Sequence, residues 1–445
     1  MIRWKVKKRI QVIFLCCVML FACILGKLGY EQLFHHGEIM EKAKESWERD
    51  FTVAGLRGSI LDSKGEKLAY DVPSTSVMVV PAQIKDADTT AKQLADILEA
   101  AEKKIKSTLT KKASTQKIQP EGRLIDDKKA KKIEELGLAG VYLVQDSLRY
   151  YPNNNYLAQV LGFTGIDNQG LAGLELQYDN ILRAQNGALK IPLDAKGHNV
   201  KMYKERYEAP GRGMDVQLTI DSTIQGIVER EVDNLVKKYH PKSALALAMN
   251  PKTGEILAMV SKPDFDPNTV SQNWNELSTN EDSVLLNRAT QGQYAPGSTF
   301  KLVTTLEFMR ENADFDSYSY NCTGSIESGD VTIHCYGGHV HGQVTLRDSL
   351  AYSCNTSFSN IGRSLNADTY KDTAQELLFN KKLPSVLPYS KSQFTLTSSD
   401  TEAERMMTAM GQGKTQVSPY HMALITSAIA NGGTLMKPYL VDSAT

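Results

Sequence analysis

The strongest hydrophobic pattern in the chain is one apolar run near its N-terminus. From Ile10 to Gly26 the only polar residue is Gln11. A helix needs about 17–25 apolar residues to cross the hydrocarbon core of a membrane. Basic residues stay on the cytoplasmic side, so the pattern predicts a cytosolic tail over 1–9, an anchor over 10–30 and an extracytoplasmic remainder. Five basic residues and no acidic residue precede the run, namely Arg3, Lys5, Lys7, Lys8 and Arg9.

Two other interpretations of this run are open, and the sequence favours neither. A cleaved signal peptide requires a small-x-small site after the apolar stretch, and no good one is found. Leu20-Phe21-Ala22-Cys23 weakly resembles a lipoprotein cleavage box, but Phe fits poorly there and the apolar run continues beyond it. A buried core helix would not explain the one-sided charge. We therefore expect an uncleaved single-pass anchor, with the rest of the chain on the outer face of the cell membrane.

Beyond the anchor, the polar pattern changes near residue 210. Residues 31–50 are typical of a helical stalk, and residues 84–140 are rich in Lys, Glu and Ala with helical periodicity. We assign the stalk and a first folded region to 31–210. The region from 211 to 445 is a second domain, which opens on strand and turn signals.

The second region begins with alternating and apolar segments that predict an α/β or α+β domain. Asp215–Ile220 alternates like a strand, and Asp221–Lys238 has helical spacing. Two apolar strands, Ser243–Met249 and Glu255–Ser261, are separated by the turn sequence Asn250–Gly254. This order indicates a β-hairpin near the start of the domain.

Charge and composition narrow the function classes. Lys and Arg together number 51, as do Asp and Glu, so the formal net charge is zero. Such a chain has no overall positive field to gather nucleic acid, and nucleic-acid binding is disfavoured. The hydrophobic share of 41% and the charged share of 23% are those of a globular protein.

Candidate chemistry first appears at Ser298 and Lys301. They lie three residues apart at the start of an apolar helical run, so they share one helix face. A serine hydroxyl becomes a good nucleophile when a neighbouring base takes its proton, and a desolvated lysine can be that base. The helix N-terminus would also favour developing negative charge. The alternative is a solvated lysine beside a helix-capping serine.

A second polar group follows about 50 residues later, in Tyr352-Ser353-Cys354-Asn355. We expect a helix to begin at Thr345 and to run into this segment. Ser353 can relay a proton, and Asn355 can hold a substrate amide and the lysine. Paired with the earlier serine and lysine, the group matches the S-x-x-K and S-x-N elements of penicillin-binding proteins. Alone, it would be an ordinary polar helix end.

The chain resembles the class B penicillin-binding proteins over nearly its whole length. Arg57–Asp62 with Gly65 looks like the family's first pedestal motif, although Ser63 stands where Arg is usual. The remaining matches occur in family order, at Arg149–Pro152, Gly162, Gly170–Glu175, Leu218–Asp221 with Gln225, Asn250–Gly254, Pro263, Asp266–Asn268, Asn287–Ala289 and Tyr294–Ser298.

The resemblance implies a membrane-anchored multidomain α+β protein. It would have an elongated pedestal, or dimerisation-type, domain over 31–210 and a transpeptidase domain of the β-lactamase-like α/β type over 211–445. It implies that Ser298 attacks a peptidoglycan stem peptide ending in D-Ala-D-Ala, and that β-lactams trap the same serine. It further implies a polytopic lipid-II polymerase as partner and no cofactor. The catalytic set would be Ser298, Lys301, Ser353 and Asn355.

Three rival functions remain at this stage. A D,D-carboxypeptidase or β-lactamase of the same fold would deliver the acyl group to water, but the long pedestal and the anchor disfavour both. A β-lactam sensor would need more membrane helices or a cytosolic signalling domain. The third rival is a non-catalytic scaffold of the wall-synthesis machinery. Its only support is that the family's third catalytic motif does not appear.

In the family, that third motif is a Lys-Thr-Gly strand that follows the segment seen here as Gly411–Pro419. Lys414-Thr415-Gln416 lacks the glycine that lets a substrate approach the strand closely, so we interpret it as unrelated to catalysis. Ser418, Pro419 and Gly432 predict a helix there instead. We therefore expect a C-terminally incomplete transpeptidase domain that is impaired as it stands.

Three cysteines lie outside the anchor. Cys322 and Cys335 would form a disulfide if they pair, which would leave Cys354 unpaired. A zinc site from His334, Cys335, His339 and His341 is the alternative. We expect no metal, because a glycine-rich loop at Tyr336-Gly337-Gly338 accounts for the cluster and the family carries a Cys and a His-Gly pair here without one.

Overall fold

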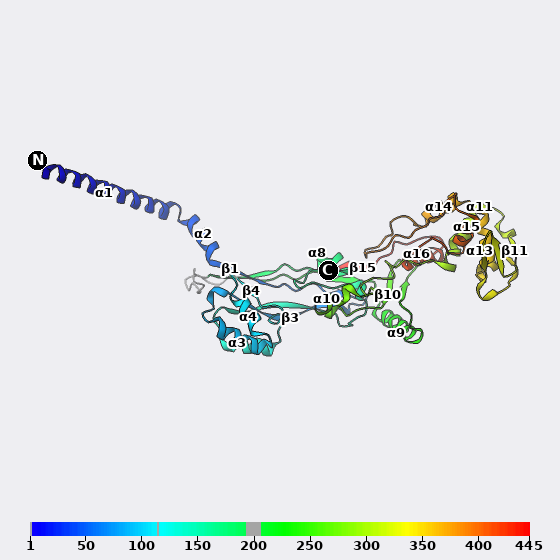
Figure 1. Ribbon diagram of the computed structural model, residues 1–445, viewed down its shortest axis with the longest axis horizontal. Coiled ribbons are helices and arrows are strands. Elements are labelled where there is room, and N and C mark those ends of the chain that lie inside the picture. The colour runs from blue at the N-terminus through cyan, green and yellow to red at the C-terminus, as the bar shows by residue number, and fades with distance from the viewer. Residues whose placement is uncertain (1, 114, 193–205) are drawn as a thin grey trace. The chain divides into compact units, whose positions relative to one another are not determined.

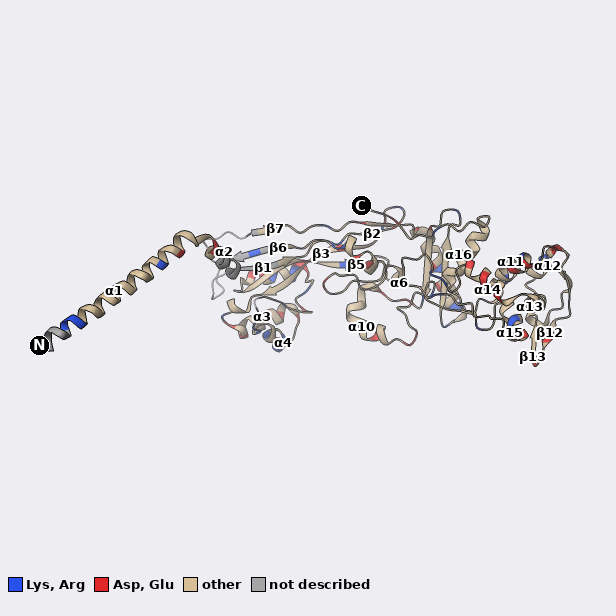
Figure 2. Ribbon diagram, turned by 90° about the horizontal axis from the view of Figure 1, so that it is seen from above, with Lys and Arg blue, Asp and Glu red and all other residues tan. Residues whose placement is uncertain are grey.

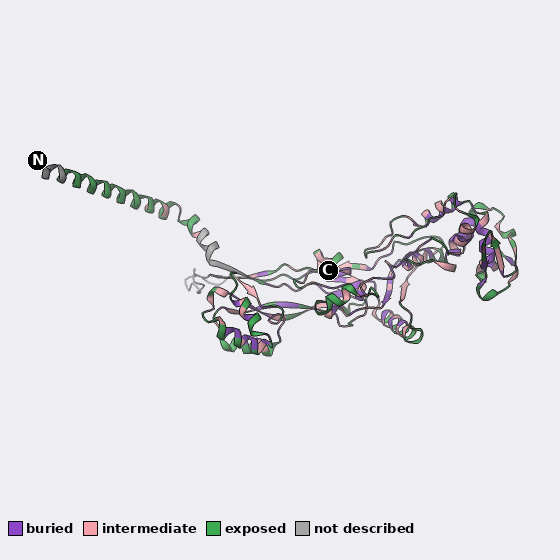
Figure 3. Cartoon of the chain, viewed as in Figure 1, coloured by how far each residue is buried: buried purple, intermediate pink, exposed green. Residues whose placement is uncertain are grey.

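The N-terminal part of the chain is one long helix, α1 (Ile2–Phe34), followed by α2 (His36–Trp47). In the computed structural model, which describes residues 2–113, 115–192 and 206–445, the side chains of α1 are exposed along almost its whole length (Figure 3). Basic residues gather at the start of the helix (Figure 2). The stretch Lys7–Phe34 is long and apolar enough to cross a membrane. It contains the predicted anchor, 10–30.

The helical stalk predicted over 31–50 holds only as far as Trp47. Strand β1 (Glu48–Val53) begins at the next residue and pairs antiparallel with β6 (Gly187–Pro192), which also pairs with β7 (Arg206–Glu208) (Figure 1). Sheet pairing with a segment more than 130 residues away decides the conformation of residues 48–50. Local helical pattern cannot reveal such a partner.

The chain divides into two compact units, each made of separate segments. Unit one comprises Met1–Gly55, Pro73–Ser147 and Gln185–Gly211, and unit two comprises the remainder, Leu56–Val72, Leu148–Ala184 and Arg212–Thr445. The boundary that we predict at 210/211, between the pedestal and the transpeptidase domain, remains a prediction. The units follow a different division, because two segments placed in the pedestal by sequence pack with the C-terminal region.

Unit one has a core of strands covered by helices. Strand β3 (Lys67–Val79), which belongs to this unit from Pro73 onward, pairs with β4 (Gln116–Lys117) and β5 (Val141–Tyr150). The helices are α3 (Ala87–Leu98), α4 (Glu102–Leu109) and α5 (Asp127–Leu136), and η1 (Pro81–Gln83) is a short 3-10 turn. Asp86 and Asp126 cap α3 and α5, as aspartates commonly do. The helical pattern predicted within 84–140 is confirmed by these three helices. The buried core includes Val77, Val79, Leu94, Ile105 and Ile133.

Unit two begins with a small mixed sheet in the order β15-β8-β2-β3. Its strands are β2 (Ile60–Leu61), β8 (Val216–Leu218), β15 (Val441–Ala444) and the first part of β3, with β2 and β8 parallel and the other pairs antiparallel. Three short helices accompany it, α6 (Ala158–Leu161), α7 (Gly173–Gln177) and α8 (Asp179–Leu182). Their apolar residues share one core with Ile60, Val216 and Leu218.

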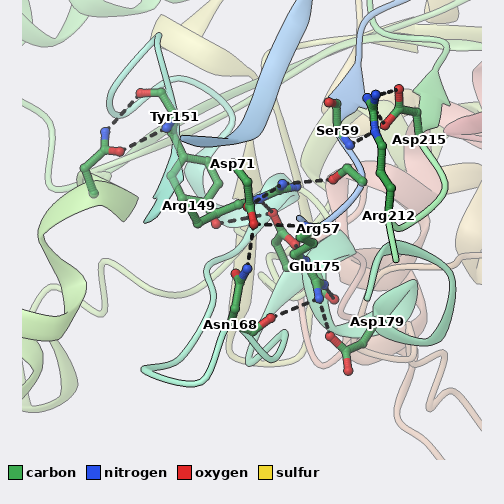
Figure 4. Close-up of polar contacts among 12 residues, drawn as sticks. Arg57, Ser59, Asp71, Arg149, Tyr151, Asn168, Glu175, Asp179, Arg212 and Asp215 are labelled. Atoms are coloured by element: carbon green, nitrogen blue, oxygen red, sulfur yellow. Dashed lines mark hydrogen bonds and ion pairs between the residues drawn. The ribbon is translucent and has the colours of Figure 1, made fainter. Parts of the chain in front are cut away.

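A buried ion network joins the quoted pedestal motifs inside unit two (Figure 4). Both guanidinium groups of Arg57 and Arg149 donate to Glu175, at 2.6 and 2.7 Å. Arg57 also pairs with Asp179 at 2.6 Å, and Arg149 with Asp71 at 3.2 Å. Glu175 has no exposed surface, so these buried partners balance its charge. The motifs therefore serve packing within this unit.

The predicted hairpin is present as β9 (Ala244–Met249) and β10 (Ile256–Lys262), which pair antiparallel. The preceding helix α9 (Ser222–Tyr239) is capped by Asp221, whose carboxylate accepts from the N–H groups of Thr223 and Ile224. Helix α16 (Pro419–Ala430) has Ser418 as its cap and packs on β9. The helix predicted after Ser418 is therefore confirmed, and its proline is at the first helical position, where no N–H is needed.

The remaining part of unit two is mostly helical. Its helices are α10 (Val270–Thr279), α11 (Lys301–Glu311), α12 (Leu346–Ala351), α13 (Asn355–Ser364), α14 (Ala367–Glu376) and α15 (Glu402–Ala409). Two small antiparallel sheets pair β11 (Ser319–Cys322) with β14 (Gly342–Thr345) and β12 (Ser325–Ser328) with β13 (Val331–His334). The 3-10 turns are η2 (Pro267–Thr269), η3 (Gly297–Phe300), η4 (Phe315–Ser317) and η5 (Tyr336–Gly338). An aromatic-rich core holds α11 against α13 and α14, with Phe300, Phe358, Tyr370 and Phe394 buried in it.

Candidate active site

Ser298 lies in η3, the 3-10 turn that leads directly into α11. Its side chain is exposed. The preceding Gly297 has φ of +58°, and its N–H donates to the carbonyl oxygen of Gly411 at 2.8 Å. A methyl group on Gly411 would lie 1.9 Å from the Gly297 oxygen. The backbones of two glycines therefore meet beside Ser298, and their contact fixes the turn that carries it.

Lys301 is the first residue of α11 and has no exposed surface. Its ammonium lies 3.3 Å from Oγ of Ser298 and 3.0 Å from Oγ of Ser353. It also donates to the backbone oxygen of Ser353 at 2.8 Å and to Oδ1 of Asn355 at 2.7 Å. The structure thus brings together all four residues singled out from the sequence.

Burial lowers the pKa of Lys301 from its ordinary 10.5 to about 8. A charged ammonium loses hydration in this position, and the salt bridges among the described residues include none that would compensate it. The neutral amine is therefore accessible near neutral pH. An amine that is neutral and close to a hydroxyl can accept its proton.

Ser353 lies in a break between two helices, and here the sequence expectation is wrong. The predicted helix begins correctly at Thr345, which forms a capping box with Asp348, but α12 ends at Ala351. Ser353 has φ of +51°, an uncommon value for a residue with a side chain, and α13 begins at Asn355. The break lets the oxygens of both residues reach Lys301. Such backbone strain is typical of functional sites.

Asn355 connects the lysine to the neighbouring sheet. Its Oδ1 accepts from Lys301, while its Nδ2 donates to the backbone oxygen of His334 at 3.0 Å. His334 is the last residue of β13. The amide therefore has a fixed orientation, with the oxygen toward the amine.

A cavity of about 800 Å³ lies above these residues and is large enough for a peptide or a drug-sized molecule. Sequence reasoning found Ser298, Ser353 and Asn355 on its wall but missed several neighbours. Gln412, for example, belongs to the Gly411-Gln412-Gly413 segment, whose two glycines both have positive φ. The further lining residues are Val331, Thr332, Ile333, His334, Tyr336, His339, His341, Tyr352, Met407 and Met410.

Lys414 does not belong to this cavity wall. Its side chain is 71% exposed and its ammonium pairs with Glu404 at 2.8 Å. Thr415 is buried, and Gln416 forms an isolated bridge with Gln393. The contacts of Lys414-Thr415-Gln416 thus agree with our interpretation that it is not the third catalytic motif.

The three cysteines that lie outside α1 converge behind the site. Sγ of Cys335 lies 3.7 Å from that of Cys322 and 3.8 Å from that of Cys354, and all three are unbonded thiols. Nδ1 of His341 lies 3.4 Å from Sγ of Cys322. The proposed pair Cys322 and Cys335 is therefore adjacent, but Cys354 is equally near to Cys335. These four side chains are the group within the described residues that could hold a metal.

Comparison with known proteins identifies the family. The model "Penicillin-binding Protein dimerisation domain" matches residues 52–218, and "Penicillin binding protein transpeptidase domain" matches residues 244–445. The chain is 39% identical to stage V sporulation protein D of Bacillus subtilis over 439 residues, which is 98% of this chain and 67% of that protein. The chain belongs to the class B penicillin-binding proteins. It therefore contains a serine-type transpeptidase domain, and relatives of this kind are named peptidoglycan D,D-transpeptidases.

More distant relatives support the same fold. Peptidoglycan D,D-transpeptidase FtsI of Escherichia coli is 26% identical over 430 residues, covering 94% of this chain and 70% of that protein. The structure of PBP2 from Helicobacter pylori, solved in complex with MreC, matches with a TM-score of 0.74 at 21% identity, over 89% of this chain and 80% of that chain. The predicted fold class, a multidomain α+β penicillin-binding protein, is confirmed. The chain spans about two thirds of the length of the curated relatives.

Proposed function

We propose that Ser298, Lys301, Ser353 and Asn355 catalyse acyl transfer from a peptidoglycan stem peptide ending in D-Ala-D-Ala. The observation that carries the proposal is the position of Lys301, buried, with two serine hydroxyls within 3.3 Å of its Nζ. One hydroxyl is exposed to the cavity, and the other lies on the strained turn beside it. This is the arrangement that an activated serine nucleophile requires.

The reaction has two balanced halves. Neutral Lys301 accepts the proton of Ser298, and Oγ attacks the carbonyl carbon of the penultimate D-Ala. The bond to the terminal D-Ala breaks, and Ser353 passes a proton from the lysine to the leaving amine. An amine of a neighbouring stem peptide then attacks the ester and returns a proton along the same route. The products are a new peptide bond and free Ser298.

β-Lactams would also acylate Ser298, but the reaction would stop at the acyl-enzyme. Attack of Ser298 opens the lactam ring, and the ring nitrogen, which takes the proton, stays attached to the acyl group. No separate leaving molecule vacates the cavity, so the ester persists. Asn355, held by His334 and Lys301, is placed to receive the amide of either substrate.

We also propose a location and partners. α1 would anchor the protein as a single-pass membrane protein, with the transpeptidase domain outside the cell membrane. A polytopic lipid-II polymerase would supply the glycan strands on which the stem peptides are carried. The Helicobacter pylori relative was solved in complex with MreC, which supports the proposal of a protein partner.

The test uses fluorescent penicillin on the full chain in detergent. We expect covalent label on wild type, at a slow rate because the Lys-Thr-Gly motif does not appear in the chain, none on Ser298→Ala, and slower labelling again of Lys301→Ala. Thr299→Ala is the matched control, because its hydroxyl is adjacent but bonds to the carbonyl of Pro296 rather than to Lys301. Label retained by Ser298→Ala would place the nucleophile elsewhere.

The rival outcomes have their own signatures. With a stem peptide and an acceptor amine, a transpeptidase forms the cross-linked product, whereas a carboxypeptidase or β-lactamase releases D-Ala or opened lactam to water alone. A scaffold does neither and takes no label. Product analysis by mass spectrometry distinguishes the three.

A further inference from the structure

A cluster of sulfur and nitrogen atoms lies immediately behind the catalytic turn. Cys322 ends β11, Cys335 follows β13, His341 precedes β14, and Cys354 caps α13. The three cysteines are at most 2% exposed. The four ligand-type atoms all lie within 4.8 Å of one another. Four separate segments therefore direct metal-binding groups to one point.

Three distances between these atoms match the edges of a tetrahedron around a metal, and all four atoms lie within 4.8 Å of one another. With Zn–S bonds of about 2.3 Å and Zn–N bonds of about 2.0 Å, tetrahedral sulfurs lie roughly 3.8 Å apart, and a sulfur and a nitrogen lie roughly 3.5 Å apart. The sulfur pairs here are 3.7 and 3.8 Å apart, and the nitrogen lies 3.4 Å from a sulfur. A disulfide would instead need sulfurs about 2.05 Å apart.

Neighbouring groups hold the cluster in a ligand-like orientation. The ring of His341 stacks on Tyr352 at 5.7 Å with an interplanar angle of 1°, which leaves Nδ1 directed at Cys322. The hydroxyl of Thr356 lies 3.2 to 3.6 Å from all three sulfurs. Hydrogen bonds around bound sulfur are a regular feature of metal sites. Apolar filler would explain the cysteines but not the oriented imidazole and hydroxyl.

We propose that Cys322, Cys335, His341 and Cys354 form a structural zinc site. Three thiolates and one imidazole fill a tetrahedron with protein ligands, which is typical of closed, non-catalytic zinc. Zn²⁺ suits this mixed sulfur and nitrogen set better than the hard cations that prefer oxygen. The site lies behind the nucleophile and takes no part in bond making.

This site revises our sequence expectation of no metal. Of the residues weighed for a zinc site, Cys335 and His341 belong to the cluster, but His334 and His339 do not. His334 contributes its backbone oxygen to Asn355, and the ring of His339 is exposed, 6.4 Å from that of His341. The missing ligands, Cys322 and Cys354, come from a preceding strand and a following helix, which sequence spacing alone did not connect.

The metal would fix the catalytic turn. Cys354 lies between Ser353 and Asn355, and both of these bond to Lys301. A metal on Cys354 would tie this turn to the ends of β11 and β13, which would offset the strain of the positive φ at Ser353. This positioning role rests on the proposed function, whereas the metal site itself does not.

The experiment measures metal in the full chain. The protein is purified in detergent from the membrane fraction, through a tag without histidines. Its zinc content is then measured by plasma mass spectrometry. We expect one zinc per chain in wild type, and a loss of at least tenfold in His341→Ala and Cys354→Ala. His339→Ala is the matched control and should keep its zinc. Replacement by Co²⁺ should give the visible bands of a tetrahedral thiolate site.

A second measurement covers variants that fail to fold. Wild type stripped with a chelator under reducing conditions should regain one equivalent of zinc on titration, with a rise in melting temperature. Penicillin acylation should slow by roughly tenfold or more on stripping and recover on titration. If zinc binds but acylation is unchanged, the positioning role fails and the site stands. A zinc-free chain, a disulfide among these cysteines detected by intact mass before and after reduction, or full zinc in both variants would overturn the site.

Discussion

The ammonium of Lys301 lies 2.7 Å from Oδ1 of Asn355, a neutral oxygen, rather than beside a carboxylate. This pairing holds the amine in place without adding the negative charge that would keep it protonated. The pKa of Lys301 can therefore follow its burial downward, to about 8.

The rate of penicillin acylation should rise with pH through about 8. Lys301 acts as a base only when neutral, and its neutral fraction falls about tenfold for each pH unit below the pKa. We expect a slope of about one in the logarithm of the rate below pH 8 and a plateau above it. Stopped-flow measurement of the acylation rate at pH values below and above 8 tests this profile. A flat profile would assign the base to another group.

Asn355→Asp should move that profile toward higher pH. A carboxylate in place of the amide oxygen stabilises the charged ammonium and raises the pKa of Lys301. At neutral pH the acylation rate should fall by tenfold or more, and alkaline buffer should recover part of it. Asn355→Ala is the control, since it lowers the rate without adding charge. An equal profile in both variants would contradict this electrostatic account.

Gly411→Ala should damage the nucleophile's turn. The added methyl group would lie 1.9 Å from the Gly297 oxygen, and φ at this position is +81°. Gly413→Ala is a matched control, because φ is +84° and its nearest neighbour atom would be 3.7 Å away. Calorimetry should show a cost of about 1–3 kcal/mol or more for Gly411→Ala and less for Gly413→Ala. Equal costs would mean that backbone conformation alone matters.

Glu175→Gln should destabilise unit two strongly. The substitution removes the buried carboxylate that Arg57 and Arg149 share and leaves each arginine with one aspartate partner. Removing one partner from a buried ion pair typically costs about 3–5 kcal/mol. Glu376→Gln, which breaks the exposed pair with Arg310, should change stability little. Urea unfolding of both variants compares them, and similar midpoints would show that the network contributes nothing.

Protease added to intact cells should digest the chain beyond about Tyr30 and spare the basic tail. The charge asymmetry of α1 predicts this orientation. Tagging each end and following the two fragments by immunoblot gives the answer. A soluble secreted chain, or one fully protected from protease, would refute the anchor.

Sequence reasoning found Lys301 and the three residues around it, because Ser298 and Lys301 have helical spacing and Ser353 and Asn355 match a short motif. The long apolar helix, the β9–β10 hairpin and the cap of α16 were also found, since apolar runs, turn residues and caps act locally. Residues 48–50 and the helix break at Ser353 were missed, because a distant strand and a contact with Lys301 decide them. Gln412 and the complete cysteine cluster were missed for the same reason. Tertiary contacts bring these residues together, and such contacts leave no periodic pattern in the local sequence.

The complete burial of Lys301 has a consequence for how protons travel. With no surface of its own open to water, its nitrogen reaches the cavity through the hydroxyls of Ser298 and Ser353, and both of these residues are exposed. The proton removed from the nucleophile therefore travels to the departing nitrogen by way of these two exposed side chains, while the amine itself stays out of contact with water.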